Sequence, residues 1–163
     1  MKKKKKAYLL SLDLSLSNSG YTVFEFNAEK SDAKPVVVGS INTKKIKARS
    51  SKLKFIADEI IKIKNKYNLV DVIIEDGFYR FKVPTLALFS VIGVVQYVLD
   101  GIPQKLYKPN SIKLTVGGRG EATKKEVLDG VLTYFNWLEF DNFDQSDSTA
   151  VGIKHLVETG ILK

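Results

Sequence analysis

The order of strand-like and helix-like segments constrains the fold of this 163-residue chain more than any other feature. Strand patterns at 9–12, 21–26 and 36–41 follow one another, which indicates an antiparallel meander. An amphipathic helix, a strand that ends at Glu75, a second helix, a short strand and further helices come next. A strand–helix–strand succession favours a parallel neighbour for the first strand. We therefore expect an α/β fold in one domain, residues 1–163, with a five-stranded mixed sheet flanked by helices on both faces.

The helix boundaries are predicted from apolar spacing and from capping residues. The first helix is expected to begin at Ser50 or Ser51, which would cap it. Further helices are expected at 84–99, 123–137 and 144–159, the last ended by Gly160. The first helix would bury a stripe spaced alternately by three and four residues: Leu53, Ile56, Ile60, Ile63 and Tyr67.

The net charge of +8 is concentrated at the N-terminus. Lys2 to Lys6 supply five of the positive charges, and this run favours a solvated, flexible tail over an auxiliary grip on polyanions. The apolar segment 7–12 is broken by Asp13 and has no cleavage-site pattern, so export is not expected. The absence of cysteine and the single histidine exclude thiolate and multi-histidine metal sites. We expect a cytoplasmic protein in which any metal ion is held by oxygen ligands.

Segment 84–99 is apolar on nearly every side. It is too short for a comfortable membrane span and contains Gln96 and Tyr97, so no membrane association is expected. One sheet can cover only one side of such a helix. A second partner is therefore needed, and we expect a homodimer formed through helix 84–99.

Four acidic residues stand where simple solvation explains them poorly. Asp13 and Glu75 each end an apolar strand, and Asp144 and Asp147 would lie one turn apart on the last helix. Each alone also fits a turn former, a cap or a solvated acid. If that helix packs across the strand ends, the four carboxylates converge and repel one another unless a divalent cation such as Mg²⁺ is bound. Two such ions can activate water for the hydrolysis of a phosphodiester.

Four motifs resemble those of the RuvC family of Holliday-junction resolvases, which have the ribonuclease H-like fold. They are "LDLSLSNSGY", "IIEDGFY", "NSIKLTVGGRGEATKKEV" and "DQSDSTAVGIKH", and the resemblance runs from about Tyr8 to His155. The first motif departs from the family, because Leu14 and Ser15 replace its usual proline and glycine. In this respect the chain looks more like the shorter resolvases that bacteriophages encode. The resemblance places the family's catalytic residues on Asp13, Glu75, Asp144, Asp147, Lys113 and Lys124, and makes the four acids its metal ligands.

The resemblance implies a homodimeric endonuclease that resolves four-way and other branched DNA by paired symmetric nicks. It implies two Mg²⁺ ions in each active site, with Mn²⁺ able to substitute, and water as the nucleophile. Two alternatives stay open: an RNase H-like nuclease acting on RNA–DNA hybrids, and a non-catalytic protein that binds junctions or forks. An actin-like ATPase is disfavoured because the chain lacks the glycine-rich phosphate loops and the second domain.

Aromatic and basic residues near the acids are expected to contact DNA. In "GFYRFK", Phe78 or Tyr79 would stack on a base of an opened junction, and Arg80 and Lys82 would contact phosphates. A packed loop with solvated charges is the alternative for this segment.

A second group of cations follows in "IKLTVGGRGEATK". The glycines around Arg119 would let it approach a phosphate closely, unless the segment is simply a flexible turn. Lys113 and Lys124 would contact the scissile phosphate or stabilise charge in the transition state, with solvated helix lysines as the alternative. His155 is expected to be structural rather than catalytic.

Overall fold

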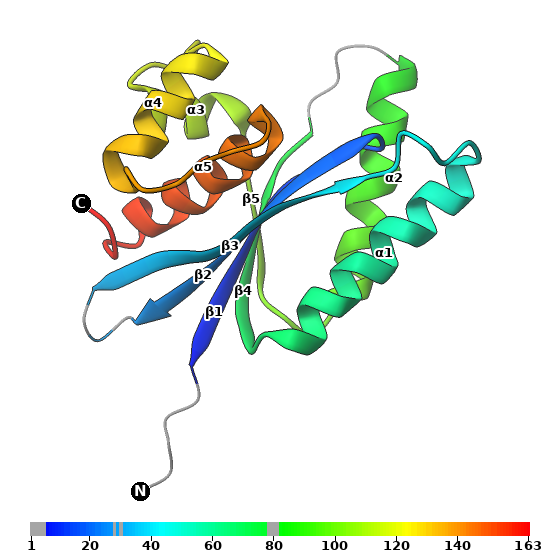
Figure 1. Cartoon of the computed structure of the whole chain (residues 1–163), viewed down its shortest axis with the longest axis horizontal. Helices are drawn as coiled ribbons and strands as arrows, with labels where there is room; N and C mark the ends of the chain where they lie inside the picture. The colour runs from blue at the N-terminus through cyan, green and yellow to red at the C-terminus, as the bar shows by residue number, and fades with distance from the viewer. Residues whose placement is uncertain (1–5, 28, 30, 78–81) are drawn as a thin grey trace, which may run out of the picture.

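The sheet of the protein has five strands in the order β3-β2-β1-β4-β5 (Figure 1). The computed structural model describes residues 6–27, 29, 31–77 and 82–163. β1 pairs with β2 and β2 with β3 in antiparallel fashion, whereas β4 pairs in parallel with both β1 and β5. The predicted five-stranded mixed sheet is confirmed. The strands span Ala7–Asp13 (β1), Asn18–Asn27 (β2), Asp32–Asn42 (β3), Leu69–Glu75 (β4) and Gln104–Tyr107 (β5).

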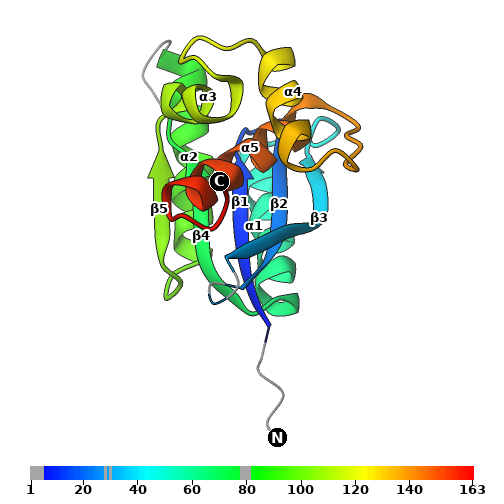
Figure 2. The same ribbon diagram turned by 90° about the vertical axis from the view of Figure 1, so that its left-hand side faces the viewer.

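Helices cover both faces of the sheet, as expected (Figures 1 and 2). α1 (Arg49–Lys66) and α2 (Lys82–Val98) pack on one face. α3 (Pro109–Gly117), α4 (Lys124–Tyr134) and α5 (Phe143–Glu158) pack on the other. Each face has its own hydrophobic core, and the sheet separates the two.

Three predicted helix boundaries were wrong. α2 begins at Lys82 rather than at residue 84. α1 begins at Arg49, its N-cap is Ala48, and no side chain caps it, so Ser50 and Ser51 lie inside the first turn. α4 ends at Tyr134 rather than residue 137, because the backbone of Phe135 leaves the helical region (φ −136°, ψ 72°). At its start α4 has a capping box between Thr123 and Glu126, which fixes the N-terminus of the helix.

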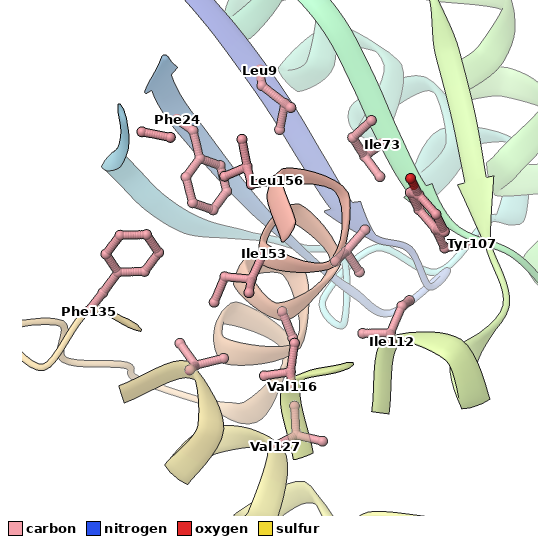
Figure 3. Packing of buried hydrophobic residues seen from close by; sticks show 14 of the residues in the cluster. Leu9, Phe24, Ile73, Tyr107, Ile112, Val116, Val127, Phe135, Ile153 and Leu156 are labelled. Atoms are coloured by element: carbon pink, nitrogen blue, oxygen red, sulfur yellow. The ribbon is translucent and has the colours of Figure 1, made fainter. Parts of the chain in front are cut away.

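Strand alternation decides which face the strand-end acids occupy. Leu9 on β1 and Ile73 on β4 belong to the same hydrophobic core as Leu156 of α5, and Figure 3 labels these three residues. Because strand side chains alternate, Asp13 lies on the same face as Leu9, and Glu75 on the same face as Ile73. Both strand-end acids therefore project toward the side of the sheet that α5 covers.

α5 approaches the sheet closely because small residues line the contact. A Cβ added at Gly20 would lie 1.8 Å from the Asp144 carbonyl oxygen. Further along α5, the buried Ser11 hydroxyl donates to the Ser148 carbonyl (2.7 Å), and the Thr22 hydroxyl bonds the Ser148 hydroxyl (3.0 Å). These contacts fix the position of α5 along β1 and β2.

His155 lies in the second half of α5 and has two polar partners. Its Nδ1 is 3.1 Å from the Tyr107 hydroxyl, and its Nε2 is 3.2 Å from a carboxylate oxygen of Asp71. Burial lowers the pKa of His155 and the nearby Asp71 opposes the shift, so a neutral ring that accepts from Tyr107 and donates to Asp71 fits both contacts. This geometry agrees with the structural role expected from the sequence.

Within residues 6–27, 29, 31–77 and 82–163, no helix has both the length and the apolar character needed to cross a membrane.

Gly20→Ala tests the close approach of α5. We expect it to lower the free energy of unfolding by roughly 1–3 kcal/mol, because the new methyl group collides with backbone that cannot rotate away. Urea unfolding followed by circular dichroism measures the change. Gly120→Ala is the matched control, since its new Cβ would meet atoms only at 3.7 Å or beyond. Equal stability of the two variants would contradict the proposed packing constraint.

Candidate active site

Four acidic residues lie near one another at one edge of the sheet. The parallel pairing of β1 and β4 runs to Leu12 opposite Ile74, so Asp13 and Glu75 are the next residues on neighbouring strands. α5 begins over the same edge, where its backbone at Asp144 contacts Gly20, the partner of Asp13 on β2. The charges of Glu75, Asp147 and Asp144 all act on Asp13. The structure therefore brings together the four acids that the sequence singled out.

Asn18 holds one of these acids, a contact that the sequence analysis missed. Its side-chain amide donates to Asp144 Oδ2 at 2.6 Å. Ser15 fixes Asn18 in turn, because the Ser15 hydroxyl donates to the backbone carbonyl of Asn18 (2.7 Å) and accepts from the backbone N–H of Asn18 (3.0 Å). The turn after Asp13 is thus tightly hydrogen-bonded although it lacks the family's proline and glycine. An amide just after a strand-end acid was the available signal, but its partner is 126 residues away.

The burial of the acids makes their negative charges unfavourable. Burial raises the pKa of Asp13 well above its usual range, and the charges of Glu75, Asp147 and Asp144 raise it further. Burial and Asp147 raise the pKa of Glu75 to about 7. Burial also raises the pKa of Asp147, against the opposing effect of Lys124. Such perturbed carboxyl groups at one edge of a sheet are typical of a functional site rather than of solvated surface acids.

Two predicted catalytic lysines lie beside the carboxylates. Lys124, the first residue of α4, places its Nζ 3.3 Å from Asp147 Oδ2. The same ammonium group lies 5.6 Å from the centre of the Phe143 ring, which precedes Asp144 and was not singled out from the sequence. Lys113 on α3 is close enough to lower the pKa of Glu75. Both cations offset part of the repulsion among the acids.

The other residues predicted to contact DNA have different surroundings. Arg119 is exposed and forms an ion pair with Glu126, in which Nη2 of Arg119 donates to both carboxylate oxygens, Oε1 (3.0 Å) and Oε2 (2.9 Å). Lys82 is exposed at the first residue of α2. Phe78, Tyr79 and Arg80 lie outside the described residues. The roles of all these residues in DNA binding stay predictions.

The acid cluster fits divalent metal ions by its chemistry. Its donors are carboxylate oxygens, which Mg²⁺ prefers. Burial raises the pKa values of Asp13 and Glu75, and so does repulsion from neighbouring carboxylates, which a cation would relieve. Within the described part of the chain, however, no three His, Cys, Asp or Glu side chains are grouped closely enough to hold an ion as they stand. The side chains would therefore have to draw together around an ion.

Asp13→Asn is expected to stabilise the metal-free protein at pH 8 by roughly 1–3 kcal/mol, because it removes one buried charge from a repulsive cluster. The folded state binds protons at Asp13 and Glu75 more tightly than the unfolded chain does. The charge of Glu75 therefore weakens folding progressively as the pH rises from about 4.5 to about 7, and the charge of Asp13 does so as the pH rises above 3.8. Urea unfolding in the presence of a chelator, at pH 5 and pH 8, measures both effects.

Asp129→Asn is the control for that measurement, because Asp129 is an exposed acid that forms an ion pair with Lys125. It should change the free energy of unfolding by less than about 0.5 kcal/mol. The gap between Asp13→Asn and the wild-type protein should widen from pH 5 to pH 8. A gap that stays constant or reverses would rule out the repulsive cluster.

Comparisons with known proteins agree on one family. The family model described as crossover junction endodeoxyribonuclease RuvC matches residues 9–155. The RuvC of Prochlorococcus marinus strain MIT 9301 is 28% identical over 155 residues, which cover 93% of this chain and 98% of that protein. The RuvC of strain MIT 9312 is 30% identical over 159 residues, with the same coverage of both chains.

Solved structures share the fold. Thermus thermophilus RuvC in complex with a Holliday junction substrate superposes with a TM-score of 0.80 at 19% identity, covering 91% of this chain and 92% of that one. The fowlpox virus resolvase bound to Holliday junction DNA gives a TM-score of 0.54 at 16% identity, covering 93% and 97%. The expected ribonuclease H-like fold is confirmed by these neighbours. With the family model matching nearly the whole chain, the protein belongs to the RuvC family of crossover junction endodeoxyribonucleases.

Proposed function

We propose that this protein is a structure-selective endonuclease that resolves Holliday junctions, and also acts on other branched DNA, by paired symmetric nicks. The observation that carries the proposal is the convergence of Asp13, Glu75, Asp144 and Asp147 in a chain of the RuvC family. Its relatives are named crossover junction endodeoxyribonucleases, and its structural neighbours include resolvases bound to junction DNA.

Catalysis is proposed to depend on metal ions, in agreement with the chemistry of the family. The four carboxylates would hold two Mg²⁺ ions, or Mn²⁺ in their place. When bound, such ions supply Lewis-acid activation of water and stabilise the leaving oxygen of a phosphodiester.

The protein's own side chains have distinct tasks in this proposal. Asn18 orients Asp144 through its amide, and the small-residue contact at Gly20 holds the start of α5 over the strand ends. Lys124 and Lys113 place positive charge where a phosphate enters the acidic edge. There they would stabilise the negative charge that develops on the phosphate oxygens.

Two copies of the chain are proposed to pair through α2. Its outer face exposes large apolar side chains: Val83 is 76% exposed, Leu86 54% and Tyr97 82%. Exposing these apolar side chains to water is unfavourable for a monomer. A symmetric dimer would bury the same apolar face on both copies of the chain. A four-way junction also has two-fold symmetry, so a dimer offers one acidic edge to each of two related strands.

The chain is further proposed to act as one nuclease domain in the cytoplasm. The two cores share one sheet, and the acids that form the site come from both ends of the sequence, at Asp13 and Asp147. This arrangement supports the single domain expected from the sequence.

Asp147→Asn is expected to reduce junction cleavage by roughly 10³-fold or more while leaving junction affinity nearly unchanged, because a proposed metal ligand is lost but the basic surface stays. Gel-based cleavage and binding assays with a synthetic four-way junction in Mg²⁺ measure both quantities. Asp129→Asn serves as the control and should cut like wild type. Undiminished nicking by Asp147→Asn would refute the assignment of the site. An RNA–DNA hybrid in a parallel assay tests the main alternative activity.

Leu86→Glu is expected to convert the dimer into monomers at micromolar concentration, because it places a charge in the proposed apolar interface. Sedimentation equilibrium measures the mass. Val36→Glu adds the same charge at an exposed apolar residue of β3 and should leave the dimer intact. A monomeric wild-type protein, or a dimeric Leu86→Glu variant, would exclude pairing through this face.

A further inference from the structure

We propose that the loop between β3 and α1, residues 43–48, is a second contact surface for the phosphate backbone of DNA. This inference rests on the proposed function and adds a binding surface to it. The loop carries Lys44, Lys45 and Lys47, and all three side chains are exposed. Three cations within four positions form a compact positive surface, which we call the loop lysines.

The topology places the loop lysines at the edge of the sheet that carries the acids. β3 and β1 run in the same direction, because both are antiparallel to β2. The end of β3 at Asn42 pairs with Asn18, while Asp13 pairs with Gly20 only two residues further along β2. The loop therefore leaves β3 beside the turn that holds Asp144.

Hydrogen bonds hold the loop in a fixed position. The backbone amide of Thr43 donates to the Ser17 carbonyl (2.9 Å), and its hydroxyl donates to the Leu16 carbonyl. The amide of Ile46 closes a turn onto the Thr43 carbonyl (2.9 Å). Ser17 directly precedes Asn18, the residue that bonds Asp144. The loop that carries the lysines is therefore hydrogen-bonded to the same turn that holds Asp144.

The charges of the loop lysines are not neutralised by nearby acids. On α1, Lys54 pairs with Asp58 and Lys62 with Glu59. In the described part of the chain, by contrast, no carboxylate lies within ion-pair distance of Lys44, Lys45 or Lys47. Solubility alone does not require three unpaired positive charges so close together, whereas such a cluster attracts the negatively charged phosphate backbone of DNA.

The loop lysines lie where they can offset the negative charge of the acidic site. Four carboxylates repel the phosphates that must approach them. Lys113 and Lys124 offset this repulsion from the side of α3 and α4, but Arg119 on that side is paired with Glu126. The loop lies on the other side, where the chain passes from β3 to α1 (Figure 1). Cations then flank the acidic edge on both sides, which suits a duplex arm lying across it.

A triple substitution with a matched control tests the loop. Lys44→Gln, Lys45→Gln and Lys47→Gln together should reduce the slope of log affinity against log salt by about 2–3, since each phosphate contact contributes about 0.9. The control replaces Lys34, Lys66 and Lys163 by Gln, which removes the same charge from exposed lysines away from the acidic edge. Fluorescence anisotropy with a labelled four-way junction and with a plain duplex, in the Asp147→Asn background, measures the slopes.

We expect both DNAs to lose affinity for the loop variant, because phosphates are common to both, and we expect little change for the control. In the otherwise wild-type protein, the loop variant should raise KM for junction cleavage and leave kcat within about twofold, since the loop does not touch the reacting phosphate. Salt slopes equal to those of the control would overturn the proposal. A fall in kcat with unchanged affinity would overturn it as well.

Site-directed cleavage gives a second, independent measurement. The chain contains no cysteine, so Lys45→Cys provides a unique thiol for an iron–EDTA probe. The probe should cut the junction backbone beside the bound protein, whereas the same probe at Lys66→Cys should not. Absence of cutting from position 45 would contradict the loop contact even if the wild-type protein resolves junctions. If the wild-type protein neither binds nor cuts junctions, the proposed function fails, and the loop contact fails with it.

Discussion

The packing of α5 against β1 and β2 is the contact on which the rest of the site depends. The missing side chain at Gly20 lets the backbone of Asp144 lie against the strand, and buried hydroxyl groups of Ser11, Thr22 and Ser148 fix the helix beyond it. Two acids from the end of the sequence are thereby set over two acids from its first half. A displacement of the helix by about one turn would carry its acids about 5 Å away from the strand ends.

The same packing makes the site electrostatically unfavourable in the absence of ligands. It buries Asp13 and Glu75 beside like charges, so their pKa values rise and the ionised cluster opposes folding. The two hydrophobic cores on either side of the sheet stabilise the fold against this repulsion. A site that weakens the protein until it binds cations is a common compromise between stability and activity.

Local patterns in the sequence were sufficient to predict the strands, the strand-end acids and the paired acids of α5. Each of these features depends on residues close together in the chain. The contact between Asn18 and Asp144 joins residues 126 positions apart, so it depends on how α5 is placed on the sheet, which periodicity does not reveal. The failed caps of α1 have a different cause. Ser50 and Ser51 are suitable capping residues, but the helix begins earlier, at Arg49. The Arg49 guanidinium donates to the Leu86 carbonyl (3.1 Å), a contact with a residue distant in the sequence that local patterns do not reveal.

The two faces of the sheet carry different sets of functional candidates. The face under α5 holds the acids, Lys113 and Lys124. Under the proposed function, changes there should act on the chemical step. The opposite face carries none of these groups, but it exposes the apolar side of α2, and the loop lysines lie at its border. Under the proposed dimer and the proposed loop contact, changes there should act on assembly and on DNA affinity. Because the sheet separates the two sets of side chains, substitutions on one face should combine additively with those on the other, unless they alter the turn at Ser17 and Asn18 that connects the loop to Asp144.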